Sequence, residues 1–286
     1  MKNKKVNIQK TEKAKYKKIK KIIKWIIIGF FLVFCVLGFD VRLKIVRYSV
    51  KNDKLKEPIC VAFIADLHSC GYGDKQETLL AAIDKENPDL ILLGGDIFDD
   101  NLSQYNAWEL IKGIASKYPC YYVTGNHEWR TKDVVNIKNT MREYGVTVLE
   151  GDVVTYEKNG ESIKICGVDD ANIGNIKFET QLNKCQNDIT EEDITILLTH
   201  RPELIDTYLA YDFDYILAGH AHGGQWRIPG IINGLFVPAQ GFLPEYTGGI
   251  YEFPTAKMII SRGLARESSL IPRFYNRPEL VIINFE

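Results

Sequence analysis

All five histidines of the 286-residue chain follow short apolar runs, and most have an aspartate, an asparagine or a second histidine beside them. Two aspartates follow another such run, in Gly95-Asp96-Ile97-Phe98-Asp99. Carboxylate, amide and imidazole donors without a thiolate suit Mn²⁺, Fe or Zn²⁺ at a reactive centre rather than a structural zinc site. The histidines lie in Asp66-Leu67-His68, Gly125-Asn126-His127-Glu128, Thr199-His200 and Gly219-His220-Ala221-His222.

The residues in these segments suit different parts of a site for two cations. Asp66 and His68, two positions apart at the end of a strand, can converge once the chain turns. Asp96 follows two glycines, so its carboxylate sits on a tight turn and is a candidate bridge, while Asn126 offers a neutral oxygen. Two metals about 3.5–4 Å apart would use about seven such donors and leave positions open for water and substrate.

The polar segments must be positioned by the apolar runs before them, which are typical of buried strands. A single histidine is most often a hydrogen-bonded core or surface residue, but five at strand ends favour one shared site. Ligands of open α/β sheets collect at the carboxyl ends of the strands, so we expect these side chains to meet at one rim. The runs are residues 60–65, 90–93, 120–124, 194–199 and 215–218.

Helices and shorter strands fill the intervals between these runs. The alternation of strands and helices predicts an α/β fold with a mostly parallel sheet. We expect one domain over residues 58–286, preceded by a connector and edge strand at residues 40–57. The predicted helices are residues 75–86, 104–117, 132–144 and 203–209. The other predicted strands are residues 41–50, 146–149, 153–157, 162–168, 257–261 and 280–284, with a hairpin turn at 158–160.

In their order along the chain, these motifs resemble the calcineurin-like metallophosphoesterase superfamily over residues 58–286. Asp66-Leu67-His68 and the stretch Gly219–Gly230 are most similar to its bacterial membrane-associated phosphodiesterase branch, with relatives that cleave UDP-2,3-diacylglucosamine. The resemblance implies a four-layer α/β/β/α sandwich around a dinuclear metal centre. It also implies that Asp66, His68 and His222 bind one metal, that Asn126, His200 and His220 bind the other, and that Asp96 bridges them.

The resemblance further implies a catalytic pair and a pocket for the substrate. His127 is expected to face the phosphate, oriented by Asp99. Arg201 either clamps a substrate phosphate or pairs with a carboxylate, and Gln225 lies on a glycine-rich turn expected to shape the pocket. The apolar residues 228–246 either dip into lipid, line an acyl pocket, or pack as core strands and loops.

The implied function is metal-dependent phosphohydrolysis. Two divalent cations and a bridging hydroxide would cleave phosphodiester, pyrophosphate or phosphomonoester bonds, with His127 assisting the leaving oxygen. Asp99 is followed by Asp100 rather than by the Arg-Gly of phosphoprotein phosphatases, which disfavours a Ser/Thr phosphatase. The alternative is a non-catalytic metal- or phosphate-binding membrane protein. A retired site predicts missing ligands, and the sequence lacks none of them; a metal store would not need the His127–Asp99 pair.

The N-terminal region is typical of a membrane anchor. Residues 1–24 hold eleven Lys and one Glu, and residues 22–39 form an apolar stretch interrupted only by Lys24. Eighteen helical residues span roughly 27 Å, close to the hydrocarbon thickness of a bilayer. The lysine-rich tail is expected in the cytoplasm and the catalytic domain outside, as a single-pass membrane protein. A cleaved signal peptide remains an alternative, because Val36 and Gly38 loosely fit a cleavage site.

Charge and cysteine content bear on the partners. Beyond residue 24 the chain carries 25 basic and 36 acidic side chains, so no stable nucleic-acid partner is expected. The partners we expect are a phosphate-ester substrate, possibly lipid-linked, and the membrane, and the oligomeric state is left open. Cys60, Cys120 and Cys166 are expected in the core; an exported domain allows a disulfide, but the spacing assigns none.

Overall fold

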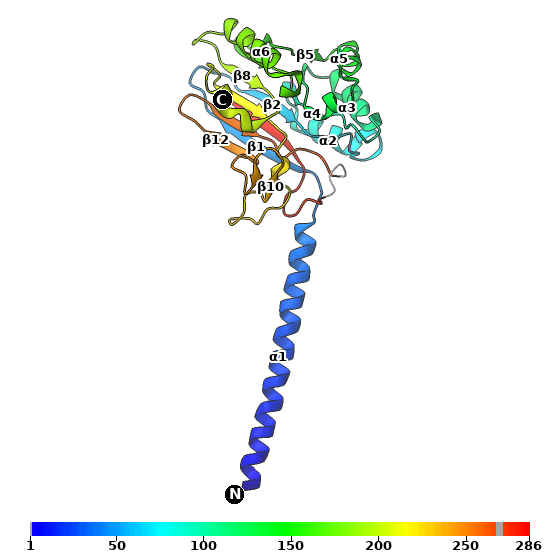
Figure 1. The fold of residues 1–286 in the computed structure, drawn as a ribbon, viewed down its shortest axis with the longest axis vertical. Coiled ribbons are helices and arrows are strands. Elements are labelled where there is room, and N and C mark those ends of the chain that lie inside the picture. The colour runs from blue at the N-terminus through cyan, green and yellow to red at the C-terminus, as the bar shows by residue number, and fades with distance from the viewer. Residues whose placement is uncertain (1, 267–270) are drawn as a thin grey trace. The chain divides into compact units, whose positions relative to one another are not determined.

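The computed structural model describes residues 2–266 and 271–286, in two compact units divided after Asp40. The first unit is the helix α1 (Lys2–Gly38) (Figure 1). Within its segment Lys15–Gly38, an 18-residue window reaches a mean hydropathy of 2.2, so the helix is long and apolar enough to cross a membrane. Phe30 and Val36 are exposed, which suits a lipid environment better than water.

The second unit contains two six-stranded sheets. In the first sheet, with the order β1-β14-β2-β3-β4-β5, only β14 and β2 are antiparallel neighbours. β2, β3 and β4 are short and almost entirely buried, as expected for parallel strands covered on both faces. The strands are β1 (Lys44–Val50), β14 (Glu279–Phe285), β2 (Ile59–Ile64), β3 (Leu90–Gly94), β4 (Cys120–Val123) and β5 (Thr147–Val148).

The second sheet has the order β12-β13-β9-β8-β7-β6. Its two outer pairs are antiparallel, and its four inner strands run parallel to one another. The strands are β12 (Gly249–Glu252), β13 (Lys257–Ile260), β9 (Tyr215–Ala218), β8 (Thr195–Leu198), β7 (Glu161–Gly167) and β6 (Asp152–Lys158).

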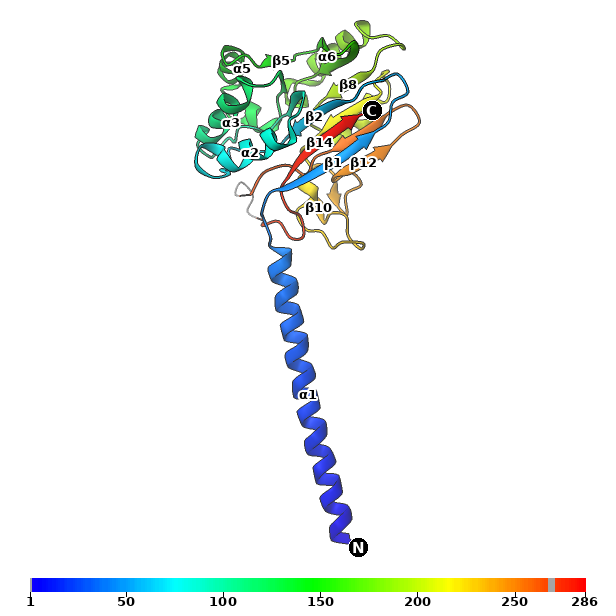
Figure 2. The same ribbon diagram turned by 180° about the vertical axis from the view of Figure 1, so that it is seen from behind.

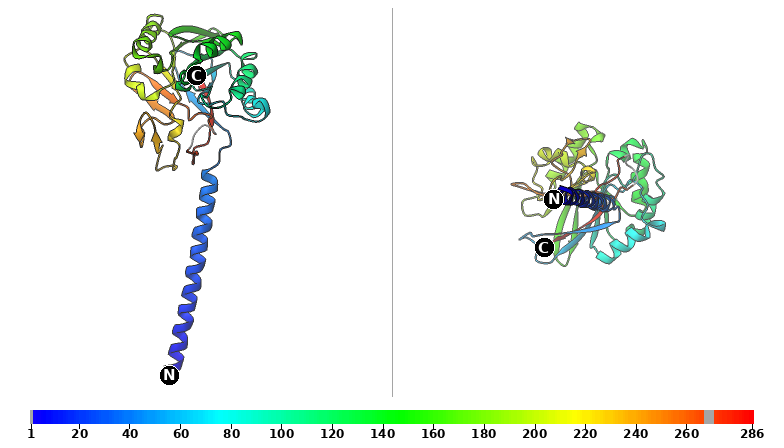
Figure 3. Two further views of the ribbon diagram at one scale, coloured as in Figure 1. Left: turned by 45° about the vertical axis from the view of Figure 1, so that its right-hand side comes forward. Right: turned by 90° about the horizontal axis from the view of Figure 1, so that it is seen from below.

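The two sheets pack face to face, and helices cover their outer faces (Figures 1 and 3). Phe63 and Leu92 of the first sheet share a buried core with Ile196 and Leu198 of the second. α2 (Glu77–Glu86), α3 (Tyr105–Ala115) and α5 (Val134–Glu143) cover the first sheet, and α6 (Asn175–Asn187) and α7 (Ile205–Tyr208) cover the second. The expected four-layer α/β/β/α architecture is therefore confirmed.

Several elements lie outside the sequence predictions. They include the short helix α4 (Asn126–Arg130), the strand β12 and the helix α6. In α6 the buried Phe178, Leu182 and Cys185 have helical spacing, but the Asn and Gln residues around them conceal the pattern.

Residues 228–246 form loops and a small hairpin of β10 (Phe236–Val237) and β11 (Gly241–Phe242). Val237 is buried in the core beneath the second sheet, whereas Phe242 is exposed. The segment is thus partly core and partly surface. The six cysteines are all free; Cys120 and Cys166 are buried and Cys60 is half-buried.

Candidate active site

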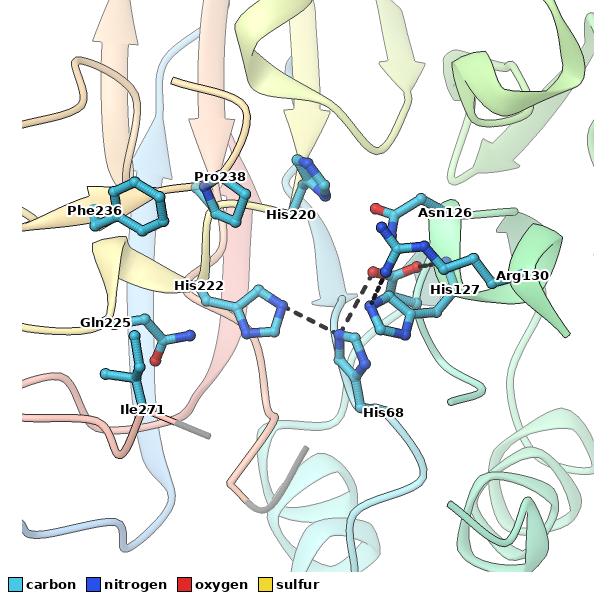
Figure 4. Close-up of a pocket in the computed structure, with 12 residues that line it drawn as sticks. His68, Asn126, His127, Arg130, His220, His222, Gln225, Phe236, Pro238 and Ile271 are labelled. Carbon is cyan, nitrogen blue, oxygen red and sulfur yellow. Dashed lines mark hydrogen bonds and ion pairs between the residues drawn. The ribbon is translucent and has the colours of Figure 1, made fainter. Parts of the chain in front are cut away.

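The polar segments meet where strands of both sheets end (Figure 4). β2, β3 and β4 end at one edge of the first sheet, and β8 and β9 end at the facing edge of the second. The rim is therefore shared by two packed sheets rather than formed by one open sheet. The first sheet contributes Asp66, His68, Asp96, Asn126 and His127, and the second contributes His200, His220 and His222.

Four of these residues form a first donor group. The ligand atoms of Asp66, His68, Asp96 and His222 all lie within 4.8 Å of one another. The Nε2 atoms of His68 and His222 are 3.1 Å apart, and His222 Nε2 is 3.4 Å from Asp66 Oδ1. Such closely spaced donors form a compact pocket for a cation.

A second donor group lies on the other side of Asp96. His200 and His220 join Asp96 in a second cluster, with 3.2 Å between His200 Nε2 and His220 Nδ1. One oxygen, Asp96 Oδ2, is 3.5 Å from His68 Nε2 and 3.2 Å from His200 Nε2. Asp96 is therefore common to both groups, which is the geometry required of a bridging ligand.

An unpaired amide oxygen beside the two groups also suits a divalent cation. The buried Oδ1 of Asn126 has no hydrogen-bond partner among the described residues. An unpaired buried amide oxygen is costly unless something outside the chain satisfies it. Carboxylate, amide and imidazole donors together match the preferences of Mn²⁺, Fe and Zn²⁺.

The charges within the cluster are strongly coupled. Burial by itself raises the pKa of Asp96, but the His200 and His68 imidazoles outweigh it and hold this pKa well below its usual range. Burial lowers the pKa of His200, but the Asp96 and Asp66 carboxylates outweigh it and raise the pKa to about 10. Burial and the neighbouring His200 together lower the pKa of His220. The Asp96 carboxylate is thus kept ionised, as a carboxylate ligand must be, whereas a cation bound to His200 would have to displace a proton from its ring.

The backbone at these ligands is in an uncommon conformation. Five of the candidate ligands have positive φ angles, which residues other than glycine rarely adopt. The surrounding fold must enforce this conformation, and such strain gathers at functional sites. The angles are 51° at Asp66, 48° at His68, 51° at Asp96, 65° at His220 and 45° at His222.

Two glycines make room for the carboxylates. A Cβ atom at Gly125 would lie 2.3 Å from Asp96 Oδ1, and one at Gly219 would lie 2.6 Å from Asp66 Oδ2. Both distances are far inside van der Waals contact. The glycine of each motif is therefore needed because the backbone passes directly against a candidate ligand.

Glu128 ties the two central loops together. Its buried carboxylate accepts hydrogen bonds from the backbone N–H groups of Asp96, Ile97, Phe98 and Gly125, at 2.7–3.0 Å. Burial and the nearby Asp96 raise the pKa of Glu128 to about 7. Its contacts are to the protein backbone, as expected for a residue that orders the loop.

His127 lies beside this cluster on α4, between an acidic and a basic neighbour. Its Nδ1 is 2.5 Å from Asp100 Oδ1 and 3.6 Å from Asp99 Oδ2. Asp99 lies closer to His68, with 3.0 Å between Asp99 Oδ2 and His68 Nδ1. Arg130 Nη1 donates to His127 Nε2 at 3.1 Å. The nearest carboxylate to His127 is thus Asp100, one residue after the aspartate expected from the motif.

Comparison with known families accounts for this combination of fold and motifs. The sequence profile of the calcineurin-like phosphoesterase family matches residues 60–224, which include all five motifs. The chain belongs to this family. As a calcineurin-like phosphoesterase it is a hydrolase of phosphate esters, and its family uses divalent metals of the kind these donor groups suit.

Individual relatives agree with this assignment. The phosphodiesterase YaeI of Escherichia coli (strain K12) is 26% identical over 236 residues, covering 79% of this chain and 82% of YaeI. A transmembrane protein with a metallophosphoesterase domain from Danio rerio is 26% identical over 197 residues, covering 64% of this chain and 45% of that protein. The Haemophilus influenzae NAD nucleotidase NadN shares the fold, with a TM-score of 0.51 and 18% identity over 73% of this chain and 46% of NadN.

Of the two residues expected to contact the substrate, Gln225 lies at the pocket of this phosphoesterase and Arg201 does not. Arg201 donates from Nε and Nη2 to the Asp170 carboxylate, at 2.6 and 3.1 Å. This is the ion pair that was one of its two predicted roles. Gln225 lines the pocket, and its buried Oε1 has no partner among the described residues.

The pocket over the phosphoesterase centre has about 400 Å³ of space and two unlike walls (Figure 4). Arg130 stands on the side of His127, and Phe236, Pro238 and Ile271 stand on the side of His222. Sequence reasoning missed Arg130, Asp100 and Ile271, whereas Phe236 and Pro238 lie in residues 228–246, for which lining a pocket was one of the alternatives. Arg130 was detectable in principle, because it follows His127 at helical spacing. The apolar wall comes from loops without a periodic pattern.

Proposed function

We propose that the chain is a membrane-anchored phosphodiesterase or pyrophosphohydrolase with a dinuclear metal centre. The observation that carries this proposal is the position of Asp96. One of its two carboxylate oxygens, Oδ2, lies within 3.5 Å of His68 in one donor group and of His200 in the other. A mononuclear site or a structural metal site would not need this sharing.

In the proposed assignment, each cation takes donors from both sheets. When bound, the two cations would screen the charge of the phosphate and lower the pKa of a water molecule. Mn²⁺, Fe and Zn²⁺ all suit the oxygen and nitrogen donors. Asp66, His68 and His222 would hold one cation, Asn126, His200 and His220 the other, and Asp96 both.

The side chains beside the metal donors would handle the substrate. His127 lines the pocket, and its Nε2, which accepts from Arg130 here, would donate a hydrogen bond or a proton to the leaving oxygen once Arg130 turns to the phosphate. Asp100, hydrogen-bonded to Nδ1, would hold the ring orientation, with Asp99 supporting His68. Arg130 adds a positive charge on the same wall, where it would attract a phosphate oxygen.

The N-terminal unit would place this enzyme at a membrane. Lys15–Gly38 has the length and composition of a span, and the preceding lysines favour a cytoplasmic N-terminus and an external catalytic domain. Anchoring raises the local concentration of cell-envelope substrates. We propose that residues 58–286 form the catalytic domain, with residues 40–57 as its connector and edge strand.

The test uses the purified full-length chain and the chromogenic diester bis(p-nitrophenyl) phosphate. We expect hydrolysis that is lost after exhaustive chelation and restored by Mn²⁺, Fe²⁺ or Zn²⁺. Elemental analysis should find about two metals per chain in the wild type and in the control Asp84→Asn, whose carboxylate lies far from the site on α2. Undiminished hydrolysis after chelation, or one tightly bound metal at full activity, would refute the dinuclear proposal.

A further inference from the structure

The first strand of the second unit, β1, lies at the edge of the first sheet. β1 is parallel to β14, and Lys44 pairs with Glu279. β14 is antiparallel to β2 with Val281 opposite Phe63, which places Glu279 level with Ala65, next to Asp66. Lys44 is therefore two strands away from the start of the first metal motif, roughly 10 Å across the sheet.

This starting point is close, along the chain, to the end of the apolar helix. α1 ends at Gly38, six residues before Lys44, and six extended residues reach at most roughly 20 Å. Arg277 also fixes the connector to the body, donating to the carbonyl oxygens of Arg42 and Leu43 at 2.9 Å. If α1 spans a bilayer, the start of β1 is therefore joined to the end of the span by no more than roughly 20 Å of chain.

Three apolar side chains in the loops that form the apolar wall of the pocket are exposed. Ile231, Phe242 and Leu243 are 80%, 77% and 69% exposed. They belong to the same segment as Phe236 and Pro238, which line the pocket. The β10–β11 hairpin lies at the end of the body where β1 begins (Figures 1 and 2).

A second cavity lies between Ile231 and the start of β1. It has about 500 Å³ of space and is lined by Lys44, Ile231, Arg227 and Arg262, among others. Lys44, at the start of β1, and Ile231, the most exposed of the three apolar residues, therefore line the same cavity. Apolar side chains beside basic ones are the composition that binds at a lipid–water interface.

We propose that Ile231, Phe242 and Leu243 form a docking tip that inserts into the bilayer surface, so that the pocket receives phosphate esters carried by membrane lipids. This proposal rests on the proposed function of the metal centre. Ile271, Phe236 and Pro238 would then continue the apolar surface from the tip into the pocket, as a path for the lipid part of the substrate. The phosphate would reach the metal donors without leaving the interface.

The decisive experiment changes the distance between anchor and body and leaves the body's sequence intact. A rigid helical (EAAAK)₄ spacer, roughly 30 Å long, or a flexible Gly/Ser linker of equal length is inserted between Asp40 and Val41. Each full-length protein is reconstituted into dioleoylphosphatidylcholine vesicles. Two diesters with the same leaving group are compared: soluble bis(p-nitrophenyl) phosphate, and phosphatidyl-p-nitrophenol within the same vesicles.

We expect the rigid spacer to reduce hydrolysis of the vesicle-borne diester at least 10-fold, while the soluble diester is cleaved within 2-fold of wild type. The flexible linker should retain most of both activities, because the body can still return to the surface. Equal vesicle-borne rates with rigid and flexible insertions would overturn the proposal. A wild type that cleaves neither diester would instead count against the proposed function, so the two failures are distinguishable.

A substitution tests the tip itself. The triple variant Ile231→Ser, Phe242→Ser and Leu243→Ser should lose about 10-fold on the vesicle-borne diester and little on the soluble one. The matched control is Val135→Ser with Ile176→Ser, which are 67% and 84% exposed on α5 and α6, away from the hairpin (Figures 1 and 2). If the triple variant hydrolyses both diesters at unchanged rates, the proposal is contradicted. A tip that docks onto another protein would give that result. If the triple variant misfolds and loses both rates, the spacer pair decides.

Discussion

The two sheets of this phosphoesterase supply different chemistry to the same site. The first sheet delivers every oxygen donor, on Asp66, Asp96 and Asn126, together with His68. The second sheet delivers His200, His220 and His222, with no carboxylate in either donor group. Each candidate donor group nevertheless draws on both sheets, so neither sheet alone holds a complete group. The packed core between the sheets is what sets the spacing of the donors.

This arrangement predicts that substitutions of different ligands reduce turnover and metal content by different amounts. A residue shared by both groups should matter most, a residue in one group should matter less, and a residue that only borders the groups should affect rate without affecting metal content. Five variants, ordered by expected effect, test whether the site works in this way.

Asp96→Asn should have the largest effect, because both donor groups lose the same charged oxygen. We expect turnover of a soluble diester to fall roughly 10⁴-fold or more, as when an essential member of a catalytic unit is removed. Elemental analysis should show loss of both metals. A variant that retained one metal and substantial turnover would show that Asp96 serves a single group.

His222→Ala and His220→Ala each remove one imidazole from one group. Losing one cation forfeits several kcal/mol of charge stabilisation, so we expect roughly 10³-fold lower turnover in each variant. Each should retain about one metal per chain by elemental analysis. If either variant lost both metals, the two groups would be one cooperative unit and the comparison would need revision.

His127→Ala should keep both metals and lose about 10²-fold in rate, which is at the low end for general acid assistance. The loss should shrink for a diester with a better leaving group, because such a group needs less protonation. Matched metal analysis separates this outcome from ligand loss. An unchanged rate on both a good and a poor leaving group would remove His127 from the chemistry.

Arg201→Gln should have the smallest effect on turnover, because its guanidinium pairs with the buried Asp170 rather than lining the pocket. Removing it leaves a buried carboxylate short of a partner, so we expect about 2–3 kcal/mol lower free energy of unfolding. Denaturant unfolding monitors this, with KM for the soluble diester within 2-fold of wild type. A large rise in KM with normal stability would restore Arg201 as a substrate clamp.

Most of the fold could be predicted because short buried strands alternate with helices. The apolar runs before Asp66, Asp96 and His127 end within one or two residues of the observed strands β2, β3 and β4. The sharing of the rim between two sheets was not evident from periodicity, since it depends on how the sheets pack. Only the family resemblance implied the second β layer.

The site was predictable as far as residue type carries the information. Histidines and aspartates at strand ends identified the candidate donors that the structure brings together, but not which carboxylate would contact His127. Asp99 and Asp100 are adjacent in sequence, and their roles are separated by the turn after β3, which has Asp99 accepting from the backbone of Asn101 and Leu102. Such a choice rests on a local hydrogen-bond pattern that composition and spacing do not encode.

If the proposed centre binds its cations only in the folded protein, the left-handed backbone at five candidate ligands links metal supply to the stability of the fold. Holding such residues in that conformation costs energy of order 1 kcal/mol or more at each position, and a ligand that binds only the folded state offsets such costs. Cells starved of divalent cations would then carry a less stable population of this enzyme, more open to proteases. Metal supply would set the abundance of the enzyme as well as its rate.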